Sequence, residues 1–95
     1  MQEKDRAEDH LEDLVHISAA HIHRRFAGYV DKEDLIQELR VYVLKRPHLA
    51  KMLDEAYEVS KDETKWVARR IMARLRRTVE KYARKEKAAK LGYST

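Results

Sequence analysis

The 95-residue sequence contains no cysteine, and it has only 2 glycines and 1 proline. Without cysteine the chain can form neither a disulfide nor a thiolate metal site. Scarce glycine and proline disfavour a β-sandwich, which needs turn residues far more often. No apolar run approaches the roughly 20 residues of a membrane span, and the acidic N-terminus lacks the basic segment of a signal peptide. We therefore expect a soluble, cytoplasmic, all-α domain with no membrane partner.

Charged residues, by contrast, make up 40% of the chain, and the two signs are unevenly distributed. Residues 1–15 carry 6 acidic and 2 basic side chains, whereas residues 61–95 carry 4 acidic and 12 basic ones. Residues 16–60 hold 7 of each, so the net charge of +4 conceals a gradient from acid to base. Solvated helix faces would explain the amount of charge. The separation of the signs is better explained if the basic end meets a polyanion.

The first half of the chain has the pattern of two helices. One is predicted from about residue 4 to residue 27, because its apolar residues recur at three- and four-residue steps. The apolar residues are Leu11, Leu14, Val15, Ile22 and Phe26, and Ser18 falls on the same face. Gly28 follows as a predicted helix terminator in the left-handed conformation. Asp31 then has the pattern of an N-cap, with Asp34 three residues later and Val30 placed as a hydrophobic staple.

The second half adds two more predicted helices. Pro47 ends the second helix and opens a short third one. The sequence Ser-Lys-Asp-Glu at residues 60–63 fits a capping box, and the long last helix is expected to run to about Lys90, with Gly92 just beyond it. The predicted fold is thus a compact all-α bundle of about four helices with a long basic C-terminal helix. It forms a single domain over residues 1–95.

The second helix has an inner and an outer side, because successive helical residues are rotated by about 100°. The inner side is formed by Leu35, Ile36, Leu39, Tyr42 and Val43. The outer side is formed by Asp34, Gln37, Glu38, Arg40, Val41 and Leu44. Two aliphatic side chains bordered by charge have the composition of an interface. Isolated exposed aliphatic residues are also ordinary, so composition alone leaves both interpretations open.

The last helix separates its faces more sharply. Its apolar face is formed by Val67, Ala68, Ile71, Met72, Leu75, Val79 and Tyr82. The opposite face is formed by Trp66, Arg69, Arg70, Ala73, Arg76, Arg77, Lys81 and Arg84. A planar aromatic ring among arginines is typical of nucleic-acid surfaces, where cations meet phosphates and the ring stacks on a base. The alternative is that Trp66 packs under the preceding short helix.

No arrangement of residues in the sequence indicates catalysis. His21 and His23 are two residues apart and point to different sides of a helix, although His16 and His23 could align. The sequence has no His-Glu-x-x-His spacing, no Ser–His–Asp pattern and no glycine-rich phosphate loop. We therefore expect no enzymatic activity, no metal, no cofactor and no small-molecule substrate.

Two segments resemble region 2 (regions 2.1 to 2.4) of bacterial RNA polymerase sigma factors. Residues 24–44, RRFAGYVDKEDLIQELRVYVL, resemble regions 2.1 and 2.2, in which an Asp-Leu-Ile-Gln-Glu run follows an aromatic–Ala–Gly turn. Residues 66–85, WVARRIMARLRRTVEKYARK, look like the family's next helix, with an aromatic residue, an Ile-Ala-Arg-like spacing and a basic tail. The first motif is moderately specific, and the second is less so because arginine-rich helices are common.

The resemblance implies a bacterial or phage sigma-like protein with two binding surfaces. In the family, the Asp-Leu-Ile-Gln-Glu helix docks on the partly basic clamp helices of the RNA polymerase β′ subunit, and the following helix contacts the minus-ten promoter element. The matching polymerase-binding positions are Asp34, Gln37, Glu38, Arg40 and Leu44, with Val41 on the same outer side. The matching DNA-binding positions are Trp66, Arg69, Arg70 and Ala73, and Arg76 and Arg77 continue the basic face.

The resemblance has limits that bear on the expected activity. Primary sigma factors have a glycine- and aromatic-rich stretch that traps flipped bases, whereas residues 48–65 contain no glycine and only Tyr57 as an aromatic residue. Opening of the DNA strands is therefore not implied. If the protein ends at Thr95, it is not a complete sigma factor. If it is the N-terminal part of a longer protein, a second DNA-binding domain is expected to follow.

The predicted function is a sigma-like role in transcription initiation, with the polymerase core and promoter DNA as partners. Two alternatives remain open on the sequence. One is a general DNA-binding protein whose last helix carries all the activity. The other is a polymerase-binding regulator that occupies the clamp helices and blocks or redirects a host sigma factor.

Overall fold

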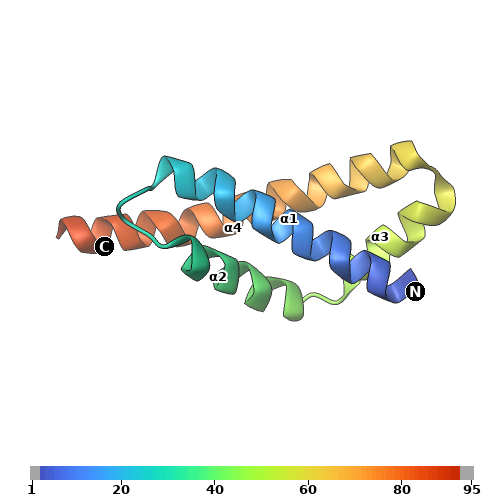
Figure 1. Ribbon diagram of the computed structural model, residues 1–95, viewed down its shortest axis with the longest axis horizontal. Helices are drawn as coiled ribbons and strands as arrows, with labels where there is room; N and C mark the ends of the chain where they lie inside the picture. Colours follow the sequence, from blue (N-terminus) through green and yellow to red (C-terminus); the bar gives the residue numbers. More distant parts are fainter. Residues whose placement is uncertain (1–2, 93–95) are drawn as a thin grey trace.

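The computed structural model describes residues 3–92 and places them in four helices packed as a bundle (Figure 1). The helices are α1 (Glu3–Arg25), α2 (Lys32–Leu44), α3 (His48–Val59) and α4 (Lys61–Leu91). The bundle is elongated, with extents of 49 × 21 × 19 Å. The two long helices, α1 and α4, run the same way along its length, and α2 returns beside them (Figure 1). The predicted all-α bundle is confirmed.

The turn between α1 and α2 differs in detail from the prediction. Helix α1 ends at Arg25, two residues earlier than expected, because the Tyr29 N–H donates to the Phe26 carbonyl at 3.0 Å and closes a tight turn. Gly28 has φ of +91° at the third position of that turn, where a left-handed residue is needed. Gly28 therefore has the predicted conformation, but it shapes the turn instead of ending the helix.

Helix α2 begins at the predicted cap, although by a different contact. Asp31 is extended at the N-cap position and its carboxylate makes no capping hydrogen bond. Its carbonyl instead accepts from the N–H groups of Asp34, at 3.1 Å, and Leu35, at 3.2 Å. The helix therefore begins at the predicted residue through backbone hydrogen bonds, without a capping contact from the Asp31 side chain. At the other end, Pro47 is the N-cap of α3, one position before its first residue.

A single serine separates α3 from α4. The Ser60 N–H donates to the Ala56 carbonyl of α3 at 3.2 Å, and its Oγ accepts from the Glu63 N–H of α4 at 3.0 Å. The serine half of the predicted capping box is therefore formed, while the Ser60 N–H is used by the preceding helix. Helix α4 then runs for 31 residues to Leu91 and is capped by Gly92, whose φ is +80°. Both features match the prediction.

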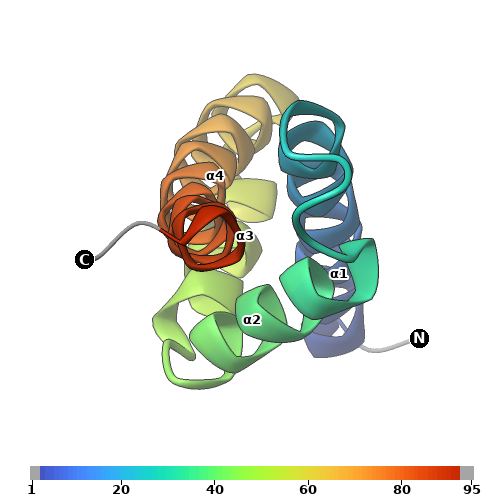
Figure 2. The ribbon, with the colours of Figure 1, turned by 90° about the vertical axis from the view of Figure 1, so that its left-hand side faces the viewer.

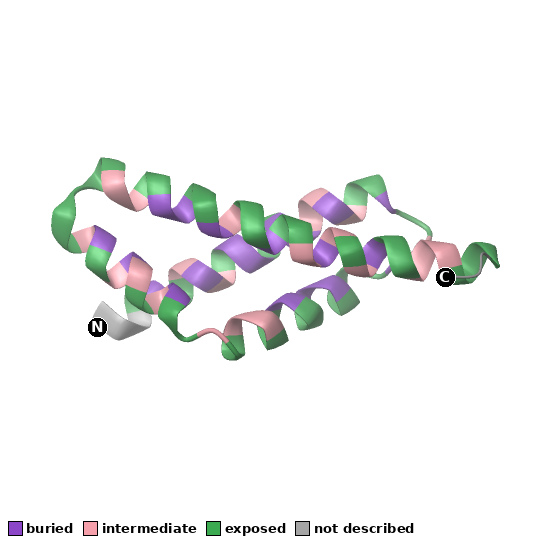
Figure 3. Cartoon of the chain, turned by 180° about the vertical axis from the view of Figure 1, so that it is seen from behind, coloured by how far each residue is buried: buried purple, intermediate pink, exposed green. Residues whose placement is uncertain are grey.

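The buried side chains follow the predicted helical faces, and Figure 3 shows them along the inner sides of the helices. The largest fully buried aliphatic residues are Ile22, Leu35, Leu39, Leu49, Leu53, Ile71 and Leu75. Each contributes about 1.5–3 kcal/mol through removal of apolar surface from water. Viewed along its length, the bundle surrounds this core with α1, α2 and α4, and α3 lies behind them (Figure 2). Among residues 3–92, no helix combines the length and apolar character needed to cross a membrane.

Candidate functional site

The outer face of α2 consists of the six residues predicted from the periodicity, and all six are exposed. We refer to Asp34, Gln37, Glu38, Arg40, Val41 and Leu44 as the α2 outer face. Its two aliphatic side chains are exposed, Val41 by 47% and Leu44 by 80%. The C-terminal end of the face is therefore apolar and in contact with water, and burying it against a partner would be favourable.

Leu44 also lies at the edge of an apolar groove that extends from α2 onto α1 and α3. Two adjoining hollows, of about 470 Å³ and 270 Å³, share four lining residues: Glu8, Leu11, Val43 and Leu44. Pro47 and Ala50 add an apolar wall from the start of α3. The sequence did not indicate this groove, because its walls come from three helices and periodicity within one helix does not show which neighbours it faces.

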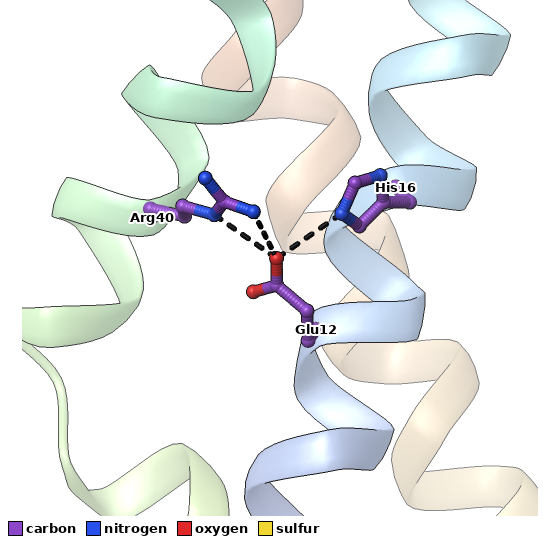
Figure 4. A network of polar contacts seen from close by, with 3 residues as sticks. All are labelled: Glu12, His16 and Arg40. Atoms are coloured by element: carbon purple, nitrogen blue, oxygen red, sulfur yellow. Dashed lines mark hydrogen bonds and ion pairs between the residues drawn. The ribbon is translucent and has the colours of Figure 1, made fainter. Parts of the chain in front are cut away.

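Arg40 links the α2 outer face to α1. Its guanidinium donates from Nε and Nη2 to Glu12 Oε1, at 3.0 and 2.5 Å, and His16 Nε2 lies 3.1 Å from the same oxygen (Figure 4). The hydrogen bond from Arg40 is the main reason that the pKa of Glu12 is below its ordinary value. Of the six residues, Arg40 is therefore the one that makes a side-chain hydrogen bond to another helix within the described part of the chain.

The acidic residues of α2 lie close to α4. Asp34 and Glu38, together with Glu86 of α4, are near enough to Tyr82 to raise the pKa of its hydroxyl, although burial is the larger cause of the increase. The carboxylates of Asp34 and Glu38 therefore lie at the edge of the α2 outer face that is nearest α4, beside Glu86. A polyanion bound to α4 would be repelled from these carboxylates, which confines it to the side of α4 that faces away from α2.

The second predicted surface is the outward side of α4, and its residues are all exposed. We refer to Trp66, Arg69, Arg70, Ala73, Arg76 and Arg77 as the α4 arginine face. Trp66 is 53% exposed, so the alternative in which this ring packs under α3 is wrong. The Arg70 guanidinium lies 4.8 Å from the centre of the Trp66 ring, a cation–π contact that leaves much of the ring accessible.

The positive charge on this part of α4 is not neutralised. Residues 64–79 contain five arginines and no carboxylate, and none of these arginines makes an ion pair within the described part of the chain. One of them, Arg74, was not among the predicted residues. It lines a hollow of about 340 Å³ with Arg70, Arg77 and Met52 of α3. Such a surface can bind phosphates without first giving up internal ion pairs.

The histidines have structural surroundings. His10 Nδ1 lies 2.7 Å from the Tyr57 hydroxyl, and His16 contacts Glu12. Within residues 6–92, no three His, Asp or Glu side chains are close enough together to hold a metal ion. The two exposed faces offer apolar contact, charge and an aromatic ring for stacking.

No protein-family model matches the sequence, and no curated protein or solved structure matches it significantly. The sigma-factor resemblance consequently depends on the two quoted segments, and functional assignment depends on the geometry of the two exposed faces.

Proposed function

We propose that this protein binds the RNA polymerase core through the α2 outer face and promoter DNA through the α4 arginine face, as region 2 of a sigma factor does. The observation that carries the proposal is the coexistence of these faces on one small bundle. The residues of α2 that are not in the core include an exposed apolar end. On α4, the outward side carries arginines that have no ion-pair partner among the described residues.

The chemistry of the α2 outer face suits a partly basic coiled coil such as the β′ clamp helices. Val41 and Leu44 offer apolar contact, and the groove beside Leu44 can receive a side chain of the partner. Asp34 and Glu38 precede this apolar end on the same face and would meet basic residues of the clamp helices. In this proposal, the acidic side chains of α2 have two roles: those of the first turn favour the start of the helix, and Asp34 and Glu38 select its partner.

The chemistry of the α4 arginine face suits DNA. Its guanidinium groups would contact phosphates, and the accessible Trp66 ring would stack on a base exposed in the minus-ten element. The carboxylates of Asp34, Glu38 and Glu86 beside Tyr82 would keep the DNA away from the α2 outer face. Polymerase and DNA could then occupy the protein at the same time.

A charge reversal on α2 tests the proposal. Glu38→Lys should weaken binding to purified core polymerase and to an isolated β′ clamp-helix fragment. Glu58→Lys is the matched control, because Glu58 is also exposed and lies on α3, outside the α2 outer face. Both changes should alter the free energy of unfolding by no more than about 0.5 kcal/mol, as is usual at surfaces. Equal binding by the two variants, or no binding by the wild type, would remove the polymerase part of the proposal.

The unneutralised arginines favour general DNA binding as a second candidate function. The same measurements distinguish it, because a general DNA-binding protein would bind duplex DNA and leave the polymerase core unbound. A polymerase-binding regulator would give the opposite result: binding to the core, with DNA affinity that is weak and nearly independent of salt.

A further inference from the structure

A basic hollow of about 300 Å³ lies at the far end of α4 from Trp66, where the end of α1 packs beside the last turns of α4. Its lining residues are Arg25, Phe26, Arg84, Lys87, Ala88 and Leu91, which we refer to as the α1–α4 hollow. Figure 1 shows these last turns of α4 next to the chain that leaves α1. None of the lining residues belongs to the α4 arginine face.

The cations of the α1–α4 hollow are held in place by the protein. Glu80 pairs with Arg25 through Oε1 and with Arg84 through Oε2, the latter at 3.3 Å, so one carboxylate holds guanidinium groups from two helices side by side. The Lys87 Nζ lies 5.1 Å from the Tyr29 ring centre and 5.9 Å from that of Phe26. Three cations against one carboxylate leave the hollow with a net positive charge.

The hollow is suited to a phosphate backbone and not to bases. Phe26 is buried, and Tyr29 is half-buried with Lys87 over its ring. Both rings are therefore less accessible for stacking than Trp66, which is exposed at the other end of the helix. What remains accessible is the charge of Arg25, Arg84 and Lys87, which a phosphodiester can meet.

The position of the hollow continues the α4 arginine face. Arg70, Arg77 and Arg84 follow one another at seven-residue steps, so they lie almost on one line along the helix. From Arg70 to Lys87 the helix rises about 26 Å, which corresponds to about eight base-pair steps of duplex. A duplex bound along the arginine face would therefore reach the hollow.

We propose that the α1–α4 hollow is a second DNA site, which binds the phosphodiester backbone of duplex DNA without reading its sequence. It would hold the duplex at the end of α4 that is opposite the base-contacting Trp66. This inference rests on the DNA part of the proposed function and extends it to residues of α1 and the C-terminal end of α4.

The test compares two double variants that remove equal charge. Arg84→Gln with Lys87→Gln removes two cations of the hollow, and Lys32→Gln with Lys45→Gln removes two exposed cations at the two ends of α2, which do not line it. The affinity for a fluorescein-labelled random-sequence duplex of about 20 base pairs is measured against salt, since that length exceeds the reach of α4. The log–log slope should fall by about 1.8 in the first variant, at about 0.9 for each lost contact, and change little in the second.

Equal reductions in both double variants would show an effect of net charge alone and would overturn the proposal, as would an unchanged slope in the first. Arg25→Gln provides an independent test from α1 and should lower the slope by about 0.9. Circular dichroism and thermal unfolding establish that each variant is folded. Two further results for Arg84→Gln with Lys87→Gln would also contradict the assignment to duplex DNA. One is weaker binding to a single strand of the same length with duplex binding intact. The other is weaker binding to polyglutamate, used as a polyanion without phosphates, with duplex binding intact.

A reference variant separates this inference from the proposed function. Arg70→Gln with Arg77→Gln should also lower the slope by about 1.8 if the α4 arginine face binds phosphates. A reduced slope in this variant but not in Arg84→Gln with Lys87→Gln would overturn only the second site. Absence of duplex binding by the wild type would overturn both.

Discussion

Replacing Trp66 by alanine distinguishes a nucleic-acid role of this ring from a structural one. The ring is 53% exposed, and the Arg70 guanidinium lies 4.8 Å from its centre. A cation–π pair at an exposed site contributes about 0.5–1 kcal/mol. The covered half of the ring also contributes, so Trp66→Ala should lower the free energy of unfolding by about 1.5–2.5 kcal/mol, whereas removing a buried tryptophan costs about 3–5 kcal/mol.

The same substitution should also weaken single-strand binding. One aromatic–base stack contributes about 1–3 kcal/mol, so the affinity for single-stranded promoter DNA should fall by about fivefold to about a hundredfold. Anisotropy of a labelled strand measures this loss, and urea unfolding followed by circular dichroism measures stability. Because Trp66 is the only tryptophan, its emission reports this ring alone. The emission should be red-shifted and should change when single-stranded DNA is added.

Ile71→Ala is the matched control on the opposite side of the same helix. Ile71 is 1% exposed, so its truncation should cost about 2–5 kcal/mol of stability and leave the DNA affinity of the folded protein unchanged. The reasoning about Trp66 would be refuted by a blue-shifted emission that DNA does not change. A stability loss above about 3 kcal/mol in Trp66→Ala would refute it equally.

Two further predictions concern the fold. Ser60→Ala should lower the free energy of unfolding by about 1 kcal/mol, because the Ser60 hydroxyl caps α4. Asp31→Ala should lower it by less, because the Asp31 carboxylate makes no capping hydrogen bond. Urea unfolding compares the two variants. Arg40 lowers the pKa of Glu12 in the folded protein, so ionised Glu12 stabilises the fold. This contribution to the free energy of unfolding is present above the pKa of Glu12 in the unfolded chain. It is lost as the pH falls through the lower pKa of Glu12 in the folded protein. Glu12→Gln should accordingly lower the urea midpoint at neutral pH, and its midpoint should converge with that of the wild type in acid; a constant difference would contradict this account of the Glu12–Arg40 pair.

Much of the fold could be predicted from local sequence signals. Pro47, Ser60 and Gly92 mark the ends of α2, α3 and α4, because their effects on the backbone depend on the residue itself and its immediate neighbours. The inward and outward faces followed from the helical period, which is the same in every α-helix. The sequence prediction placed the end of α1 two residues too late, because the turn from Phe26 to Tyr29 begins before Gly28. No local sequence signal marks where that turn begins.

Contacts between helices could not be predicted in the same way. Arg40 pairs with Glu12, and Arg25 with Glu80, across 28 and 55 residues of sequence. Such pairs depend on how far each helix is rotated and shifted relative to its neighbours, which side-chain packing in the core decides. The same reason explains why the apolar groove beside Leu44 and the α1–α4 hollow appear only in the structure.

The most direct test of the central claim uses the absence of cysteine from the chain. A single cysteine placed by Leu44→Cys can carry a photo-crosslinker at the most exposed apolar position of the α2 outer face. Ala73→Cys on α4 is the matched probe, because Ala73 is also exposed and lies on the α4 arginine face. In a mixture of core polymerase and promoter DNA, the proposal predicts that the probe at residue 44 crosslinks to the β′ clamp helices and the probe at residue 73 to DNA. Crosslinking of the residue 44 probe to DNA, or to no part of the polymerase, would contradict it.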